Sequence, residues 1–95
     1  PYLYLAAQIH AGRDGIARAL AAPPATESPY TTDAARLPTS LGEALDALEA
    51  DRALVDAFGS DVVAWLVHVK RHELARCAQA EDPAAWQARE YCSRF

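Results

Sequence analysis

The 95-residue sequence predicts an all-α fold of four to five helices. Hydrophobic residues make up 52% of the chain, and many are alanines, which favour helix and bury little area each. Apolar residues recur at helical spacing, and no stretch alternates as a strand does. Residues that cap or break helices separate these apolar stretches. We expect residues 1–95 to form a single helical segment of marginal stability.

The first helix is expected over residues 2–20. Its apolar residues lie four, seven and four positions apart and share one face: Leu5, Ile9, Ile16 and Leu20. Pro1 suits a first helical position, where its missing N–H costs nothing. Gly12 and Gly15 each cost about 1 kcal/mol relative to alanine in a helix interior. We therefore expect a close neighbour to pack against them, and that neighbour can lie outside this chain.

Residues 21–39 are predicted to form a Pro-rich connector. The prolines stop regular helix, and the serines and threonines between them favour turns and loops. The segment is long for a loop in a compact domain, which is typical of functional or mobile loops.

The helical bundle is expected over residues 40–95, and its first two helices carry clear start signals. Ser40 and Glu43 have the spacing of a capping box, in which each side chain accepts from the other residue's backbone N–H. Asp51 is expected to cap a short second helix that Gly59 ends.

The last two helices of the bundle are predicted from similar signals. Ser60 is expected to cap a long helix whose apolar face includes Val63 and Val67. Asp82 and Pro83 favour a final helix, with aspartate as its N-cap and proline at its first position, ending at residue 95.

Charge and cysteine content exclude several classes of function. The formal net charge of −4 argues against a nucleic-acid partner and against an anionic membrane surface. Cys77 and Cys92 match neither a zinc spacing nor a redox motif, so we expect free thiols. No run has the length of a membrane span and no signal peptide is visible, so we expect a cytoplasmic location.

His68 and His72 are the candidate metal ligands of the chain. They stand four residues apart on one helix face, a spacing that can hold a metal ion between two imidazoles. The zinc-protease arrangement requires glutamate directly after the first histidine, where this chain has Val69, and no third ligand is evident. The alternative is a solvated helix face. From the residues alone we find no catalytic residue and no metal or cofactor site.

Three stretches carry a resemblance to a known family. PYLYLAAQIHAGRDGI, the later LPTSLGEALDALEADRALVDAFGSDVVAWLVHVKRHEL and the terminal WQAREYCSRF resemble, in this order, segments of glutamine synthetases. Together the stretches cover nearly the whole chain. The resemblance implies the C-terminal helical part of a larger α/β catalytic domain, so we expect Pro1 to be an internal residue of a longer polypeptide.

The resemblance also implies what the parent enzyme does. Members use ATP and Mg²⁺ or Mn²⁺ to join ammonia, or in some relatives an amine, to the γ-carboxylate of glutamate. Their metal ligands and substrate-binding arginines lie upstream of this segment, so no catalytic residue carries over to this chain. The expected partners are the rest of the catalytic domain and further copies of the parent. The alternative is a free-standing helical interaction module without activity.

Tyr30 is the regulatory candidate that the resemblance suggests. Some bacterial members are adenylylated on a connector tyrosine, but the sequence around Tyr30, SPYTTD, lacks the Leu-Pro that follows that tyrosine. An ordinary loop tyrosine is the alternative. Arg13, Tyr4 and His10 also depart from the family's usual residues, which leaves the nitrogen substrate open. The chain terminus favours amine-ligating or unregulated relatives.

Overall fold

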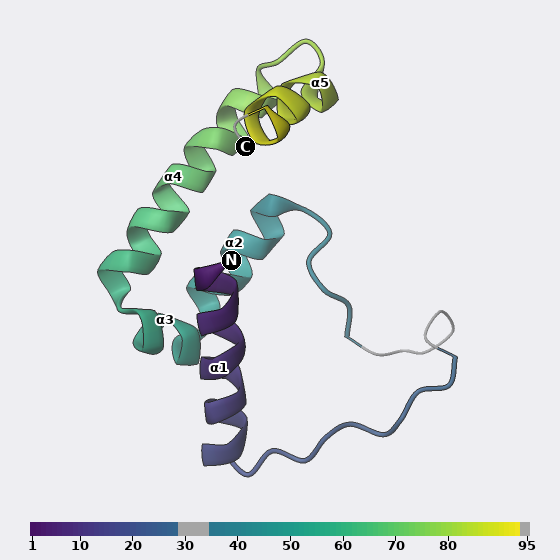
Figure 1. The fold of residues 1–95 in the computed structure, drawn as a ribbon, viewed down its shortest axis with the longest axis vertical. Helices are drawn as coiled ribbons and strands as arrows, with labels where there is room; N and C mark the ends of the chain where they lie inside the picture. Colours follow the sequence, from purple (N-terminus) through teal and green to yellow (C-terminus); the bar gives the residue numbers. More distant parts are fainter. Residues whose placement is uncertain (29–34, 94–95) are drawn as a thin grey trace.

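The computed structural model describes residues 1–28 and 35–93, and these contain helices and no strands. Figure 1 shows the elements in chain order: α1 (Tyr2–Ala17), α2 (Leu41–Ala50), α3 (Arg52–Phe58), α4 (Ser60–Ala78), α5 (Pro83–Gln87) and the π-helical turn η1 (Ala88–Cys92). The predicted all-α class is confirmed. Within the described residues, no helix is long and apolar enough to cross a membrane.

Helix α1 ends at Ala17, so the helix expected over residues 2–20 is too long at its C-terminus. Ala19 adopts a left-handed conformation with φ of 49°. The Ala19 N–H donates to the carbonyl of Ile16 at 3.1 Å, and the Leu20 N–H donates to that of Gly15 at 3.0 Å. This pair of bonds is a Schellman motif, which satisfies the last carbonyls and turns the chain out of the helix.

Three of the predicted N-caps are confirmed. The Ser40 hydroxyl accepts from the Glu43 N–H at 3.2 Å. The carboxylates of Asp51 and Asp82 accept from the backbone N–H three residues ahead, at 3.1 and 3.0 Å. The reciprocal half of the capping box is shifted by one residue, because Glu43 accepts from the N–H of Thr39 at 2.8 Å.

The prediction that Ser60 caps the long helix is wrong. Ser60 is already the first residue of α4, and Gly59 precedes it without any side-chain cap. Gly59 has φ of 88°, a conformation that favours glycine, and it ends α3 as expected. One glycine therefore separates two helices that follow each other directly.

The final helix is shorter than the sequence predicts. Helix α5 ends at Gln87, and the chain continues as the π-helical turn η1 up to Cys92. The helix was expected to run to residue 95, but residues 94 and 95 lie outside the described part of the chain.

The helices pack in pairs around a small core. Helix α2 lies along α4, and α1 lies against α3. Leu45, Val63 and Val67 are buried at the centre of this arrangement, with Leu48, Val55 and Phe58 packed around them. Such a core is small for a chain of this length, so much apolar surface stays outside it.

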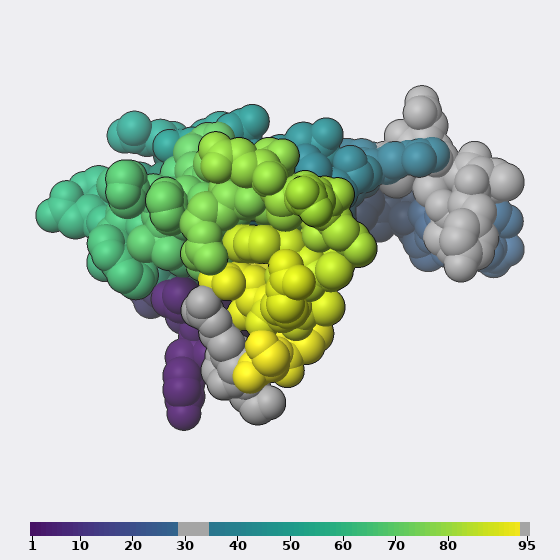
Figure 2. All heavy atoms as spheres, turned by 90° about the horizontal axis from the view of Figure 1, so that it is seen from above, coloured from purple at the N-terminus to yellow at the C-terminus, as the bar shows by residue number. Residues whose placement is uncertain are grey.

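The connector extends away from the helices. Its described residues, 18–28 and 35–40, are all exposed, and they project from the helical body in Figures 1 and 2. The radius of gyration is 16.5 Å. A compact domain of 100 residues has about 13 Å, so this chain is far from compact.

Candidate functional site

The outer face of α1 is an exposed apolar surface. Of the residues expected to share one face, Leu5 is 54% exposed, Ile9 63% and Ile16 82%, whereas Leu20 lies beyond the end of the helix. No residue of α1 is buried. An apolar surface of this kind, on a helix that already packs against another helix, makes this face a candidate interface.

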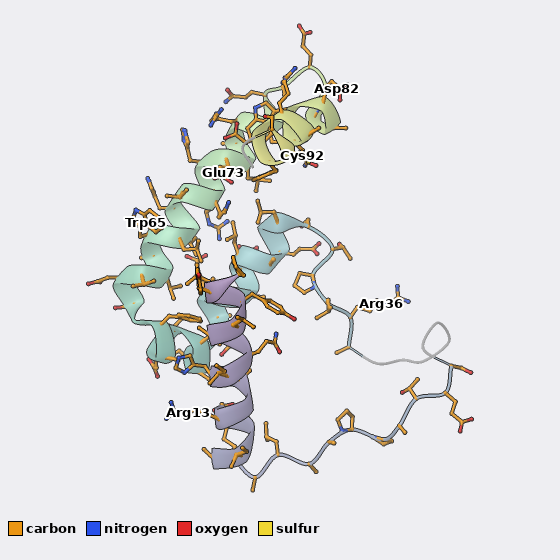
Figure 3. All side chains as sticks on the ribbon, viewed as in Figure 1. Arg13, Arg36, Trp65, Glu73, Asp82 and Cys92 are labelled. Carbon is orange, nitrogen blue, oxygen red and sulfur yellow. The ribbon has the colours of Figure 1, made fainter. Side chains whose placement is uncertain are left out.

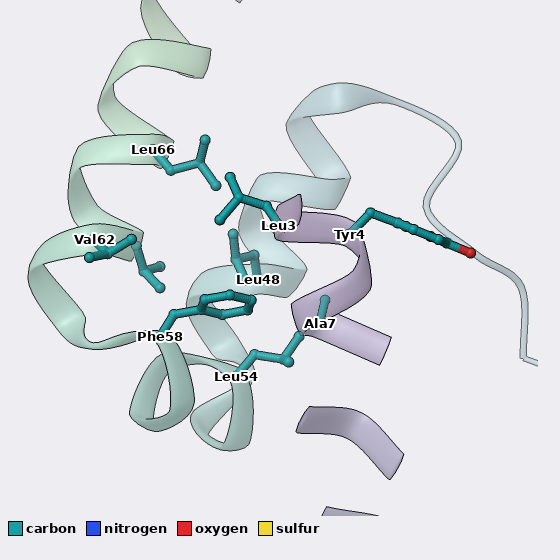
Figure 4. A pocket seen from close by; sticks show the side chains of 9 residues that line it. Leu3, Tyr4, Ala7, Leu48, Leu54, Phe58, Val62 and Leu66 are labelled. Atoms are coloured by element: carbon teal, nitrogen blue, oxygen red, sulfur yellow. The ribbon is translucent and has the colours of Figure 1, made fainter. Parts of the chain in front are cut away.

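The opposite side of α1 makes the contacts within the chain. Leu3 points toward Leu48 and Leu66 in Figure 4, and it helps to line an apolar hollow of about 240 Å³. The His10 ring lies 5.5 Å from the Phe58 ring, centroid to centroid. His10 therefore packs against α3 through its ring, as a structural histidine does.

The two glycines of α1 have no close neighbour among the described residues. A Cβ atom built on Gly12 or on Gly15 would meet nothing within 4 Å. The described residues therefore do not supply the close neighbour that the sequence led us to expect. Together with the exposed outer face of α1, this leaves the side of the helix that carries Gly12 open to a partner.

A polar cluster joins α4 to the C-terminal turn. The hydroxyl of Tyr91 donates to a Glu73 carboxylate oxygen at 2.7 Å, and the Lys70 ammonium donates to the same oxygen at 2.8 Å. The Lys70 ammonium also lies 5.4 Å from the centroid of the Tyr91 ring. In Figure 3, Glu73 lies on α4 near α5 and η1. These residues border a mixed polar and apolar hollow of about 630 Å³.

The hydrogen bond to Glu73 raises the pKa of Tyr91 to about 12, with burial as a smaller cause. Tyr91 is 40% exposed, which is consistent with this order of causes. A bond that the neutral hydroxyl donates to a carboxylate disfavours loss of its proton. Tyr91 at neutral pH is therefore a hydrogen-bond donor that holds η1 against α4.

Two further contacts fix the C-terminal helices on α4. The Arg76 guanidinium lies 5.3 Å from the Trp86 ring centroid, a cation–π geometry. The buried Cys77 sulfur lies 3.7 Å from the Gln87 side-chain nitrogen. Cys77 and Cys92 are both free thiols, as predicted, and Cys92 is exposed. The buried Cys77 thus has the surroundings of a structural residue.

Arg71 ties α4 to α2 at the surface. Its guanidinium contacts the carboxylates of Asp46 at 2.7 Å and Glu49 at 2.5 Å. Both carboxylates hydrogen-bond to Arg71 and raise its pKa further above the ordinary value. Asp46 and Glu49 therefore serve as ion-pair partners of Arg71.

The structure places the two candidate metal ligands on the surface of α4. His68 and His72 are both exposed. Across residues 1–28 and 35–93, no group of three or more histidine, cysteine, aspartate or glutamate side chains is arranged to hold a metal ion. Tyr30, the regulatory candidate, lies outside the described residues. Both assignments stay predictions.

The Tyr91 cluster was not predicted from the sequence. Lys70 and Glu73 stand three apart in a helix, which is a recognisable pairing distance. Tyr91 lies 18 residues beyond Glu73. Only the turn between α4 and α5 brings its hydroxyl to that carboxylate, and no local pattern encodes this return.

Comparison with known proteins gives a consistent result along the chain. Residues 1–91 match the family model of the glutamine synthetase catalytic domain. The chain is 38% identical over 101 residues to the gamma-glutamylanilide synthase of an Acinetobacter species, covering 96% of this chain and 20% of that protein. It is 40% identical over 98 residues to the gamma-glutamylethanolamide synthetase of Streptomyces coelicolor, covering 100% of this chain and 20% of that protein.

A third relative, the glutamine synthetase of Halobacterium salinarum, is 36% identical over 104 residues, covering 100% of this chain and 22% of that protein. No solved structure matched the chain with significance. The chain thus spans about a fifth of the length of these curated relatives.

Proposed function

Because this chain belongs to the glutamine synthetase family, we propose that it is the C-terminal helical part of a larger ATP-dependent ligase. That parent enzyme joins ammonia or an amine to the γ-carboxylate of glutamate. The observation that carries the proposal is the family match over residues 1–91, in a chain about a fifth as long as its relatives. The cytoplasmic location expected from the sequence belongs to the same proposal.

Within the parent, the role of this segment is structural. Its outer α1 face, with Ile9 exposed to 63% and Ile16 to 82%, supports docking against the rest of the catalytic domain. Burial of apolar surface stabilises by about 25 cal/mol per Å², so covering this exposed face would stabilise the helix. The same docking accounts for Gly12 and Gly15, which permit close approach of another backbone.

Nucleotide and metal binding are assigned to the remainder of the parent enzyme. A divalent cation that serves ATP takes carboxylate, imidazole or water ligands. The described residues supply no group of three suitable side chains, and His68 with His72 makes only a pair. As the family resemblance implies, we assign no catalytic residue to this chain, and we expect the parent to assemble as a homo-oligomer.

We propose that the nitrogen substrate is ammonia or an amine, and the assay described below tests both. Two of the relatives are named for the anilide and the ethanolamide of a γ-glutamyl group, and a third is named a glutamine synthetase. The three share a γ-glutamyl product and differ in the nitrogen compound.

The second candidate is a free-standing helical interaction module. The packing of α2, α3 and α4 against one another favours it. A module must fold cooperatively by itself, whereas a dependent segment unfolds gradually when its cover is missing. Thermal unfolding of the isolated chain, followed by circular dichroism, separates the two. A sharp, concentration-independent transition would favour the module.

The decisive experiment assays the full-length parent. Purified parent is incubated with ATP, Mg²⁺ and glutamate, together with ammonia, ethanolamine or aniline in separate reactions, and phosphate release and γ-glutamyl product are measured. We expect product with at least one nitrogen compound, and none from the isolated 95-residue chain. A folded parent that forms no γ-glutamyl product with any of them contradicts the proposal.

A further inference from the structure

An apolar hollow between α1, α2, α3 and α4 is separate from the outer face of α1. Its volume is about 240 Å³, and side chains from all four of the first helices line it. Figure 4 shows Leu3, Leu66 and Phe58 converging on it. Tyr4 is the one lining residue with a polar side-chain group, and its hydroxyl points away from the other labelled residues.

The hollow is open at its rim. Leu3 is 52% exposed and Val62 is 48% exposed, although both contribute to the lining. Protein interiors close such gaps to high packing density, so an apolar hollow of this kind is incomplete without a further group. The missing group must be apolar, because a polar group placed there would lose its hydrogen bonds to water.

The size of the hollow favours a protein side chain over a small-molecule ligand. Ligand pockets measure about 300–1,000 Å³ and contain a few polar groups that orient the ligand. This hollow is smaller, and the described residues that line it include no charged residue. One or two large apolar side chains of a peptide segment match both the small volume and the apolar lining.

The N-terminal end of α1 forms one wall of the hollow. Leu3 and Tyr4, in the first turn of the helix, both line it. Figure 1 places the N-terminus beside α2, at this same end of α1. An extended residue spans about 3.3–3.6 Å, so each residue before Pro1 can carry the chain that much further across the opening.

We infer that the polypeptide preceding Pro1 in the parent enzyme lies over this hollow and fills it with one or two apolar side chains. The inference rests on the proposed function, which makes this chain part of a longer polypeptide. A segment joined to Pro1 acts at an effective concentration in the range of about 1 mM or more. The attached segment therefore reaches the hollow without an association step, which favours it over a free copy of the chain.

Photo-cross-linking in the full-length parent tests this inference. Photoreactive benzoylphenylalanine replaces Val62, the protein is irradiated, and cross-linked peptides are mapped by mass spectrometry. We expect a cross-link within one polypeptide, to a segment that precedes Pro1. The matched control carries the same photoreactive residue at His68, which is exposed on α4 and does not line the hollow. That control should yield no cross-link to the same segment.

Two outcomes would overturn the inference. A cross-link between two polypeptides would show that a second copy covers the hollow. Cross-links confined to residues of α1–α4, or none at all, would show that the hollow stays uncovered. Circular dichroism establishes that the variant is folded, and the same replacement at Leu66, another lining residue, serves if the Val62 variant is not.

The ligase assay on the same preparation separates this inference from the proposed function. An active parent without the expected cross-link refutes the inference alone. An inactive parent that gives the cross-link refutes the proposed chemistry and leaves the docking intact.

Discussion

At the scale of single residues, Ala19 adopts a left-handed backbone conformation that is unfavourable for alanine. It is the one non-glycine residue with positive φ among the described residues, at 49°, and it occupies the position after the C-cap where glycine is usual. A left-handed conformation costs an L-residue about 1–2 kcal/mol. The Schellman bonds of Ala19 and Leu20 must offset this strain.

Replacing Ala19 with glycine should therefore stabilise the end of α1. We expect Ala19→Gly to raise the free energy of unfolding by about 1 kcal/mol, since glycine adopts positive φ without strain. Ala11→Gly is the matched control, because Ala11 is exposed in the interior of α1, where glycine costs about 1 kcal/mol. Urea unfolding followed by circular dichroism measures both. Equal destabilisation by the two variants would contradict the αL assignment of Ala19.

Tyr91 makes a prediction at alkaline pH. Its pKa rises from 10.0 to about 12 in the folded chain through the hydrogen bond to Glu73. Below pH 10 the hydroxyl is protonated in both states, so the bond contributes its full stability. That contribution declines as the pH rises from about 10 toward 12, because the unfolded state loses its proton first.

Spectroscopic titration of tyrosinate checks this prediction. The wild-type chain should show an ionisation near pH 12 that Tyr91→Phe lacks. Glu73→Gln removes the acceptor carboxylate and should move that ionisation toward lower pH. An unchanged high-pH step in Tyr91→Phe would exclude Tyr91 as its source.

At the scale of elements, helix starts depend on whether a side chain reaches the first free N–H groups. Ser40 does so at 3.2 Å, and Glu43 reaches back past it to Thr39. The hydrogen bond from the Thr39 N–H is the main cause that lowers the pKa of Glu43. Its contribution to stability is therefore present at neutral pH and is lost as the pH falls through that pKa. Ser60 looks similar in sequence but lies inside α4 and caps nothing.

Two matched serine variants test this difference. Ser40→Ala should lower the free energy of unfolding by about 1 kcal/mol, the typical loss of an N-cap. Ser60→Ala should leave it unchanged or slightly higher, because alanine is the better helix former. Chemical denaturation of each variant gives the two values. A comparable loss at Ser60 would mean that it caps α4 after all.

At the scale of the whole molecule, the small core and the exposed α1 face point to the same dependence. Within the described residues, Leu45, Val63, Val67 and Cys77 are the buried hydrophobic residues. Helix α1 contributes none of them. A chain of this size with so few buried side chains has little stability to spare.

Substitution on the outer face of α1 should therefore affect the parent and spare the isolated chain. We expect Ile9→Asp to lower the thermal stability of the parent strongly, because docking would bury an unpaired carboxylate. In the isolated chain the same change should have little effect, since Ile9 is 63% exposed. Gln8→Asp is the control, since Gln8 is an exposed polar neighbour and should be tolerated in both. Equal tolerance of both variants in the parent would contradict docking through Ile9.

Much of this architecture follows from the sequence because it depends on local chemistry. The all-α class and the caps at Ser40, Asp51 and Asp82 require only residues three or four apart, so spacing and side-chain type predict them. The apolar face of Leu5, Ile9 and Ile16 is likewise a property of helical period. Family membership also rests on residues in sequence order.

Only the tertiary structure decided the features that depend on where distant residues meet. The end of α1 at Ala17 depends on Ala19 adopting positive φ, and an alanine at this position does not predict that conformation. The Tyr91–Glu73 bond joins residues that a turn brings back together. Which side of α1 packs on α3, and which stays uncovered, depends on the pairing of whole helices. Local propensity fixes the elements, whereas their docking is selected by total burial over contacts that no short stretch contains.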